Sequence, residues 1–181
     1  MDSTLRASSP QIGTTPWMRP LPARARLILF GDSAVQSAAA EVLALPYSTN
    51  ACRAVSHGAR AALWLGPDER LLLAPQAELP TLLAALTTRL AGQAHSLVDI
   101  SQRQVAFELH GPHASTLLNA QCALDLALDA FPVGMCTRTV FAKAEIVLWR
   151  TAADCFQVEV WRSFADYLVT LLRDVSRELP G

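Results

Sequence analysis

Residues 98–162 decide the fold, and they read VDISQRQVAFELHGPHASTLLNAQCALDLALDAFPVGMCTRTVFAKAEIVLWRTAADCFQVEVWR. A strand pattern leads into Gly111 and Pro112, a helical pattern follows, and three more strand patterns run to Trp161. Proline is tolerated in the first turn of a helix, so the Gly-Pro pair marks a strand-to-helix turn. Hairpin-linked strands grouped between helices predict an α+β fold in which helices pack on a largely antiparallel sheet.

An earlier part of the chain repeats this plan. The matching positions include Gly31 with Gly111, Cys52 with Cys136, Trp64 with Trp149, and Asp68 with Asp154. They lie about 80–86 residues apart, which is longer than the roughly 20–50 residues of solenoid repeats. We therefore predict a duplicated β-α-β-β-β-α unit with largely antiparallel sheets and packed helices.

The expected division is an extended N-terminal arm over residues 1–22, a first α+β half over 23–94 and a second α+β half over 95–181. The arm is rich in Pro, Ser and Thr and lacks a periodic apolar pattern. The predicted strands are 26–30, 50–55, 60–65, 70–74, 96–100, 104–109, 136–141, 145–150 and 155–161, and the predicted helices are 33–45, 76–90, 112–120 and 163–178.

The composition points to a surface that other chains cover. Charged residues make up 17% of the chain, below the about 25% typical of soluble domains, while hydrophobic residues make up 51%. A large core or a surface covered by another protein would each explain this balance. The net charge is −1 and no stripe of Lys or Arg occurs, which argues against nucleic acid as a partner.

The expected cellular location rests on the lack of membrane and secretion signals in the sequence. No run of about 18 apolar residues appears, and the N-terminal segment has no apolar signal region. The four cysteines are scattered without a C-x-x-C pair, which is typical of reduced thiols. We therefore expect a cytoplasmic protein without a membrane association.

Residues 27–33 end in Gly-Asp-Ser and resemble the nucleophile block of the SGNH/GDSL hydrolases. A nucleophilic Ser33 would need a histidine base and an oriented carboxylate. The late D-x-x-H and the G-x-N-D block of that family are absent. We therefore interpret Asp32 as the N-cap of a helix that contains Ser33 in its first turn.

Other polar residues receive structural interpretations. His110 and His113 flank a Gly-Pro turn, so their rings need not converge on a metal. Glu108 and Glu159 alternate with apolar residues, as outward-facing strand charges do. No G-x-G-x-x-G or P-loop motif occurs. No catalytic, cofactor-binding or metal-binding residue is predicted in this chain.

Two Trp-Arg pairs are the expected partner-binding residues. Trp149-Arg150 and Trp161-Arg162 lie at the ends of adjacent predicted strands, and Trp17 is an apolar anchor in the arm. Trp and Arg are enriched among the residues that dominate interface energies. We predict that the two pairs form one rim of the sheet that contacts larger proteins; a purely structural rim with Trp in the core is the alternative.

The second half also resembles a known family. The similar segments are 98–105, 109–114, 122–126, 131–139, 142–145 and 158–164. They resemble the gamma subunit of heterotetrameric sarcosine oxidase, over roughly residues 20–175. That family in turn resembles the folate-binding domain of the glycine-cleavage T-protein, whose duplicated α+β fold agrees with the repeat.

The resemblance implies a subunit of an enzyme that converts sarcosine to glycine and forms 5,10-methylenetetrahydrofolate and hydrogen peroxide. It implies partners in the alpha, beta and delta subunits, with FAD, FMN, NAD, zinc and tetrahydrofolate bound outside this chain. The implied role of this chain is structural, in assembly without an active site of its own. Self-association of the isolated chain is left open.

The chain departs from the T-protein pattern at its folate segment. T-proteins carry a segment resembling R-T-G-Y-T-G-E-x-G-F-E, and residues 150–157 here read RTAADCFQ. Arg150 and Thr151 match, the glycines and the first glutamate are missing, and Gln157 replaces the final glutamate. A pterin needs acceptors for its paired donors. We therefore expect that folate binding is lost, with a free-standing folate-binding one-carbon protein as the alternative function.

Overall fold

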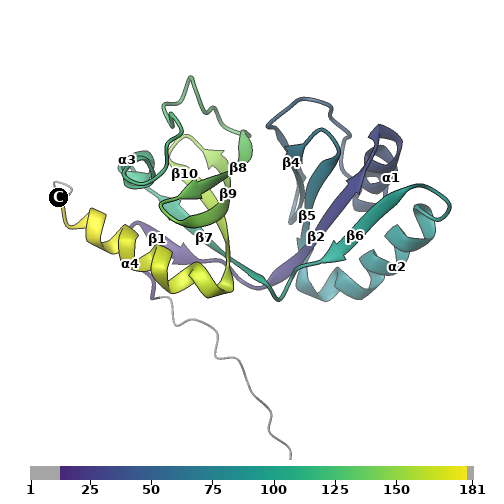
Figure 1. The fold of residues 1–181 in the computed structure, drawn as a ribbon, viewed down its shortest axis with the longest axis horizontal. Coiled ribbons are helices and arrows are strands. Elements are labelled where there is room, and N and C mark those ends of the chain that lie inside the picture. Colours follow the sequence, from purple (N-terminus) through teal and green to yellow (C-terminus); the bar gives the residue numbers. More distant parts are fainter. Residues whose placement is uncertain (1–12, 179–181) are drawn as a thin grey trace, which may run out of the picture.

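The computed structural model describes residues 13–178, and within this range two antiparallel sheets lie between two layers of helices (Figure 1). The first sheet has the strand order β3-β4-β5-β2-β6. Its strands are β2 (Arg24–Gly31), β3 (Ala54–His57), β4 (Arg60–Gly66), β5 (Glu69–Pro75) and β6 (His95–Asp99).

The second sheet has the strand order β1-β7-β10-β9-β8, and all of its pairings are antiparallel. Its strands are β1 (Met18–Pro20), β7 (Gln104–His110), β8 (Cys136–Phe141), β9 (Ala144–Ala152) and β10 (Cys155–Trp161). The central strands follow the same connectivity in both sheets, so the predicted α+β class and its duplicated unit are confirmed.

The two units exchange their edge strands. β1 comes just before β2 in the chain but pairs with β7, where Met18 lies opposite Leu109. β6 comes just before β7 but pairs with β2, where Val98 lies opposite Ile28. Strand pairing therefore crosses the expected boundaries after residues 22 and 94, while the division of the chain into domains stays a prediction.

The helices begin where the sequence supplies a suitable first turn. In α1 (Ser33–Leu43), Asp32 Oδ1 accepts hydrogen bonds from the backbone N–H groups of Ala34 and Val35, each at 3.0 Å. Asp32 is thus the predicted N-cap. The helix ends at Ala44, which has a left-handed φ of 54°.

The other helices are shorter than their sequence patterns suggest. They are α2 (Leu79–Arg89), α3 (Ala114–Asn119) and α4 (Ala165–Ser176), with 3-10 turns η1 (Gln76–Glu78) before α2 and η2 (Arg162–Phe164) before α4. Each 3-10 turn directly follows the last strand of its unit. The tighter turn brings the chain from the sheet edge into the following helix.

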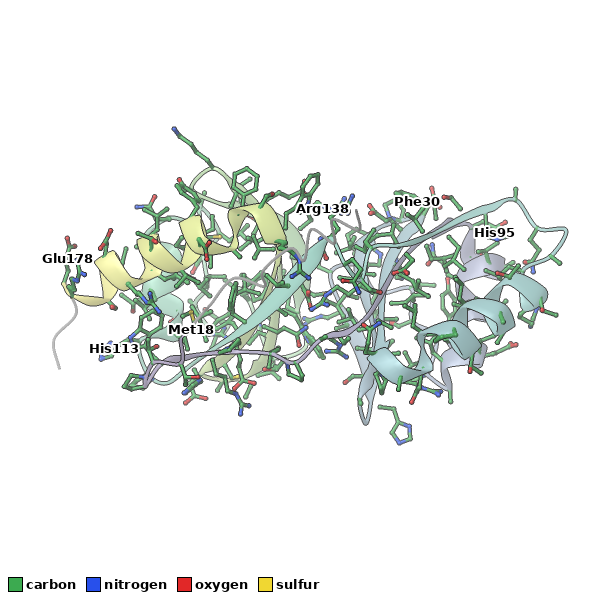
Figure 2. The ribbon with its side chains drawn as sticks, turned by 90° about the horizontal axis from the view of Figure 1, so that it is seen from below. Met18, Phe30, His95, His113, Arg138 and Glu178 are labelled. Carbon is green, nitrogen blue, oxygen red and sulfur yellow. The ribbon has the colours of Figure 1, made fainter. Side chains whose placement is uncertain are left out.

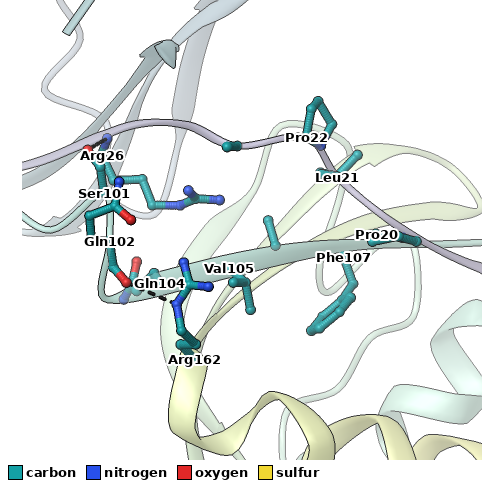
Figure 3. A pocket seen from close by; sticks show the side chains of 12 residues that line it. Pro20, Leu21, Pro22, Arg26, Ser101, Gln102, Gln104, Val105, Phe107 and Arg162 are labelled. Atoms are coloured by element: carbon teal, nitrogen blue, oxygen red, sulfur yellow. Dashed lines mark hydrogen bonds between the residues drawn. The ribbon is translucent and has the colours of Figure 1, made fainter. Parts of the chain in front are cut away.

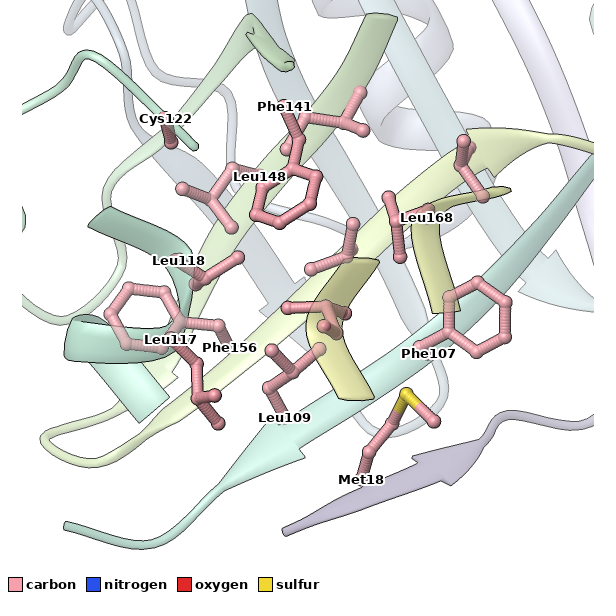
Figure 4. Packing of buried hydrophobic residues seen from close by; sticks show 14 of the residues in the cluster. Met18, Phe107, Leu109, Leu117, Leu118, Cys122, Phe141, Leu148, Phe156 and Leu168 are labelled. Atoms are coloured by element: carbon pink, nitrogen blue, oxygen red, sulfur yellow. The ribbon is translucent and has the colours of Figure 1, made fainter. Parts of the chain in front are cut away.

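Three apolar clusters hold the layers together. One lies between the first sheet and helices α1 and α2, and a second lies between the second sheet and helices α3 and α4 (Figure 4). The third lies between the two sheets, where Leu63 and Leu71 of the first sheet share a cluster with Cys136 and Val147 of the second. Both faces of each sheet are therefore covered in part, in the order helix, sheet, sheet, helix.

Polar contacts also join the two sheets. Cys136 donates its backbone N–H to Cys52 O and Ala54 donates to Gly134 O, both at 2.9 Å. Arg138 forms two hydrogen bonds with the Glu69 carboxylate, and it lies beside the inter-sheet region in Figure 2. These bonds fix the edge of one sheet against the other.

Candidate functional site

A buried ion pair lies at the centre of the inter-sheet contact. Arg26 of β2 donates from Nε to Glu159 Oε2 of β10 at 2.6 Å, and the two side chains are 2% and 1% exposed. Glu159 was expected to be an outward-facing strand charge, and that interpretation was wrong. The Glu159 side chain does not meet water, because β2 of the first sheet packs over this part of β10.

The ion pair continues into a small polar network. Gln157 donates from Nε2 to Glu159 Oε1 at 2.7 Å, which satisfies the second carboxylate oxygen. On the other side, Arg26 N–H donates to Ser101 Oγ at 2.9 Å, and Ser101 Oγ lies 2.5 Å from Asp99 Oδ1. Because buried charges require such partners, the network fixes the two sheets in one relative position.

The first cavity lies on the Arg26 side of this network and has a volume of about 210 Å³. Segment 20–23 and the start of β7 enclose it, together with Arg162 (Figure 3). Arg162 donates from Nε to Gln102 O at 3.1 Å, and Gln104 Oε1 is buried without a hydrogen-bond partner among residues 13–178. The cavity is small and its polar groups are mostly held by the protein itself.

The second cavity lies on the Gln157 side and is larger, with a volume of about 620 Å³. Its floor is a row of three side chains across the second sheet, Glu108 of β7, Gln157 of β10 and Trp149 of β9, which are paired neighbours. Its other walls are the β3–β4 hairpin, the end of β5 and residues 21–24. Segment 21–23 separates the two cavities.

The predicted partner-binding residues do not form one rim. β9 and β10 are antiparallel, so Trp149 near the end of β9 and Trp161 at the end of β10 lie at opposite ends of the pair. The expectation of a shared rim was wrong. The carboxyl-terminal ends of two neighbouring antiparallel strands lie at opposite edges of the sheet.

The two members of the first pair have different surroundings. Arg150 is 3% exposed, lies 4.4 Å from the ring centre of Phe156 and donates to Phe131 O. It therefore supports the loop that follows α3. Trp149 is half-buried against the inter-sheet cluster and lines the larger cavity. Trp17 is half-buried against the core of the second sheet.

Trp161 of the second pair belongs to a group of exposed aromatic side chains that are close in sequence. We call this group the aromatic patch, and its members are Trp161, Phe164 and Tyr167. These side chains are 38%, 39% and 36% exposed. The Phe164 and Tyr167 rings meet edge to face with 6.3 Å between their centres. Arg103 lies 4.6 Å from the ring centre of Trp161, which is a cation–π arrangement with a residue that the sequence did not single out.

Across residues 13–178, no group of three or more His, Cys, Asp or Glu side chains could hold a metal ion. His113 precedes α3 as its N-cap residue and makes no side-chain capping bond. Among the described helices, none is long and apolar enough to cross a membrane.

The polar groups that could meet the paired donors of a pterin are partly engaged in the larger cavity. Glu108 Oε1 accepts from Arg19 Nε at 2.7 Å, and Gln157 Nε2 donates to Glu159 Oε1 at 2.7 Å. Arg150, the residue that matches the T-protein segment, is turned to the loop carbonyls instead.

The sequence analysis did not assign four residues to the contact between the sheets, namely Arg24, Arg26, Gln157 and Glu159. The alternation of residues along β2 did indicate that Arg24, Arg26 and Ile28 share one face of that strand. Alternation separates two faces of a strand but does not say whether the second face meets water or another sheet. These polar residues could be recognised as buried only once the packing of one sheet against the other was known.

Comparisons with known proteins agree on one family. Residues 30–178 match the family described as sarcosine oxidase, gamma subunit. The sarcosine oxidase subunit gamma of Corynebacterium sp. (strain P-1) is 36% identical over 119 residues, which are 65% of this chain and 57% of that relative. The matched segment therefore spans little more than half of the curated relative.

Solved structures show the same likeness. A chain of the heterotetrameric sarcosine oxidase from Corynebacterium sp. U-96 superposes with a TM-score of 0.82 at 28% identity, over 89% of this chain and 83% of that one. The aminomethyltransferase T of Bartonella henselae shares the fold, with a TM-score of 0.68 at 16% identity over 88% of this chain and 46% of that one. The chain belongs to the sarcosine oxidase gamma subunit family.

Proposed function

We propose that this chain is the gamma subunit of a heterotetrameric sarcosine oxidase and that it assembles and stabilises the complex without catalysing a step itself. The observation that carries the proposal is the match to a chain of a heterotetrameric sarcosine oxidase over 89% of this chain. The family match over residues 30–178 supports it independently. The complex would act in sarcosine catabolism and one-carbon metabolism.

In this proposal the reaction belongs to the partners. The alpha, beta and delta subunits would bind FAD, FMN, NAD, zinc and tetrahydrofolate, and the complex would form glycine, 5,10-methylenetetrahydrofolate and hydrogen peroxide from sarcosine. The charged groups at the centre of this chain are engaged with one another, as Arg26 with Glu159 and Arg138 with Glu69. They support a rigid scaffold. Four free thiols are consistent with a cytoplasmic location.

The aromatic patch is the surface that we propose for partner contact. Trp161 and Phe164 are more than a third exposed although they are large and apolar, and Tyr167 continues the patch on α4. The sheet end beneath them is rigid, since Trp161 closes the β10–β7 ladder. Rigid aromatic side chains with a nearby arginine are typical of residues that dominate binding energy. The other partner contacts predicted from the sequence stay predictions, and we place them second to the aromatic patch. They are Trp17, Trp149, Arg150 and Arg162.

The patch is tested by co-expressing tagged partner subunits with the Trp161→Ala/Phe164→Ala chain. Loss of two interface anchors should weaken association at least about tenfold. Tyr47→Ala is the matched control, because Tyr47 is an aromatic residue of similar exposure on the other half of the chain. Equal recovery of the double variant and the control, with both chains folded by circular dichroism, would rule out the patch.

The alternative of a free-standing folate-binding protein is not favoured by the comparisons. A tetrahydropterin without a glutamate tail tests it directly, since it retains only the group that a folate site must recognise. We expect no saturable binding to the full chain at micromolar concentration. Micromolar binding would favour the alternative.

A further inference from the structure

The larger cavity has the dimensions of a small-molecule site. Its volume of about 620 Å³ lies within the roughly 300–1,000 Å³ typical of ligand pockets. Its walls come from both sheets, so the inter-sheet contact shapes it. The aromatic patch does not line it. Any ligand of this cavity is therefore a property beyond the proposed assembly role.

Three charged side chains line the cavity, and two of them are neutralised inside the protein. Arg60 pairs with Glu78 at 2.8 Å, and Glu108 pairs with Arg19 at 2.7 Å. Arg24 is the exception. Its Nη2 donates to Ala59 O at 2.8 Å, but no carboxylate within residues 13–178 lies within 4.0 Å of its guanidinium.

The Arg24 guanidinium is also partly removed from water. Burial lowers its pKa, the negative charge of Glu159 raises it, and the positive charge of Arg26 lowers it. A desolvated cation gains more from an anion than an exposed cation does, because the surrounding dielectric constant is lower. Arginine also matches the geometry of a carboxylate, with two parallel N–H donors.

Trp149 contributes part of its indole ring to the wall of the same cavity. Its Nε1 is buried and has no hydrogen-bond acceptor among the described residues. Because that atom has no accessible surface, the ring acts as an apolar wall and not as a donor to a ligand. The remaining lining includes Pro22, Pro75 and several alanines, which suit an apolar body.

We propose that this cavity binds a small organic carboxylate, with the carboxylate on Arg24 and the apolar body against Pro22, Pro75 and the indole ring of Trp149. Benzoate is a suitable probe, and benzamide is its uncharged counterpart of nearly the same shape.

The binding constant is measured by equilibrium dialysis of radiolabelled benzoate against the full chain. The site is located by the shift of the Trp149 indole ¹H–¹⁵N resonance, which Trp149→Phe assigns. We expect saturable benzoate binding, weaker binding of benzamide, and a loss of at least about tenfold in affinity for Arg24→Gln. Trp149→Phe replaces the indole with a smaller aromatic wall, so it should cost a smaller factor.

Arg177→Gln is the control, because Arg177 is exposed and pairs only with Asp174 three residues earlier. It should leave benzoate affinity unchanged. Arg24→Lys keeps the positive charge without the paired donors and should bind with intermediate affinity, which separates a lost contact from a misfolded variant. Equal affinity of wild type and Arg24→Gln, or a Trp149 resonance that does not move at saturation, would overturn the proposal.

Arg24 could bind either a free small carboxylate or the carboxylate side chain of a neighbouring protein. Measurements on the assembled complex distinguish these two occupants. This arm rests on the proposed function. Dialysis compares complexes that contain the wild-type chain with complexes that contain Arg24→Gln. One additional benzoate site in the wild-type complex identifies a free carboxylate as the occupant. Binding to the isolated chain that disappears on assembly identifies a carboxylate of a partner.

Discussion

Arg26 and Glu159 form the contact on which the relative position of the two sheets depends most. Their side chains are almost fully buried, and each lies in a strand of a different sheet. A buried pair contributes little net stability, since desolvation offsets attraction. Its effect is specificity: any other packing of the sheets would leave two charges without partners.

Glu159→Ala should lower the free energy of unfolding by about 3–5 kcal/mol, because it leaves the Arg26 guanidinium buried and unpaired. Urea denaturation followed by circular dichroism measures the change. The double variant Arg26→Met/Glu159→Leu should recover most of the loss, since apolar residues replace both charges. As a control, Glu41→Ala breaks the exposed pair with Arg89 and should cost less than about 1 kcal/mol. A loss of that small size for Glu159→Ala would mean that water reaches the pair.

Cys136 should be inert towards thiol reagents in the folded chain. Its side chain is buried between the sheets, and burial raises the pKa of the thiol to about 12. The thiolate is the reactive form, and the thiol is almost entirely protonated at pH 8, far below that value. Iodoacetamide at pH 8 followed by peptide mass spectrometry should therefore find Cys136 unmodified until the chain is unfolded. Modification in the native state would show that the inter-sheet layer opens readily.

At the scale of elements, the exchanged edge strands distinguish this fold from two independent halves. β1 contributes Met18, which is fully buried, to the core of the second sheet although it precedes the whole first unit in the chain. β6 does the converse for the first sheet. Each unit is therefore completed by a strand that directly precedes the other unit.

Met18→Ala should destabilise the chain by about 2–5 kcal/mol, as expected for a fully buried methionine. Hydrogen exchange should then show the loss of protection first in β7, the strand with which β1 pairs. Thr14→Ala, at an exposed position of the same segment, is the control. If Met18→Ala were as stable as the control, β1 would contribute nothing to the second sheet.

Most strands, the β4–β5 hairpin and the start of α1 could be predicted from local patterns. Asp32 marked the start of α1, and residues 66–68 marked the β4–β5 hairpin, because caps and turns depend on a few adjacent residues. Strand exchange could not be predicted. Alternation of apolar residues identifies an edge strand but does not specify which of two similar sheets it joins.

The candidate site was less predictable than the fold. Arg24 and Trp149 lie about 125 residues apart in sequence, and only the packing of two sheets brings them to one cavity. The Trp-Arg pairs were noticed because of their composition. Their positions at opposite sheet ends, and the burial of Arg150, followed from strand direction and loop packing instead.

At the scale of the whole molecule, the low charge fraction has two structural causes. Three apolar clusters, rather than one, occupy the layers between helices and sheets. In addition, large apolar side chains remain exposed on the aromatic patch and at other positions, including Phe30, Val98 and Val140. The apolar clusters are the large core that the composition allowed. The exposed apolar side chains are the surface that the proposed association with larger subunits would cover.

Native mass spectrometry of the chain co-expressed with candidate alpha, beta and delta subunits measures whether the chain enters their complex. We expect a heterotetramer that contains one copy of this chain, and a complex that loses stability when this chain is omitted. A partner complex that forms with undiminished stability in its absence, while this chain remains separate, would show that the chain is not a structural subunit.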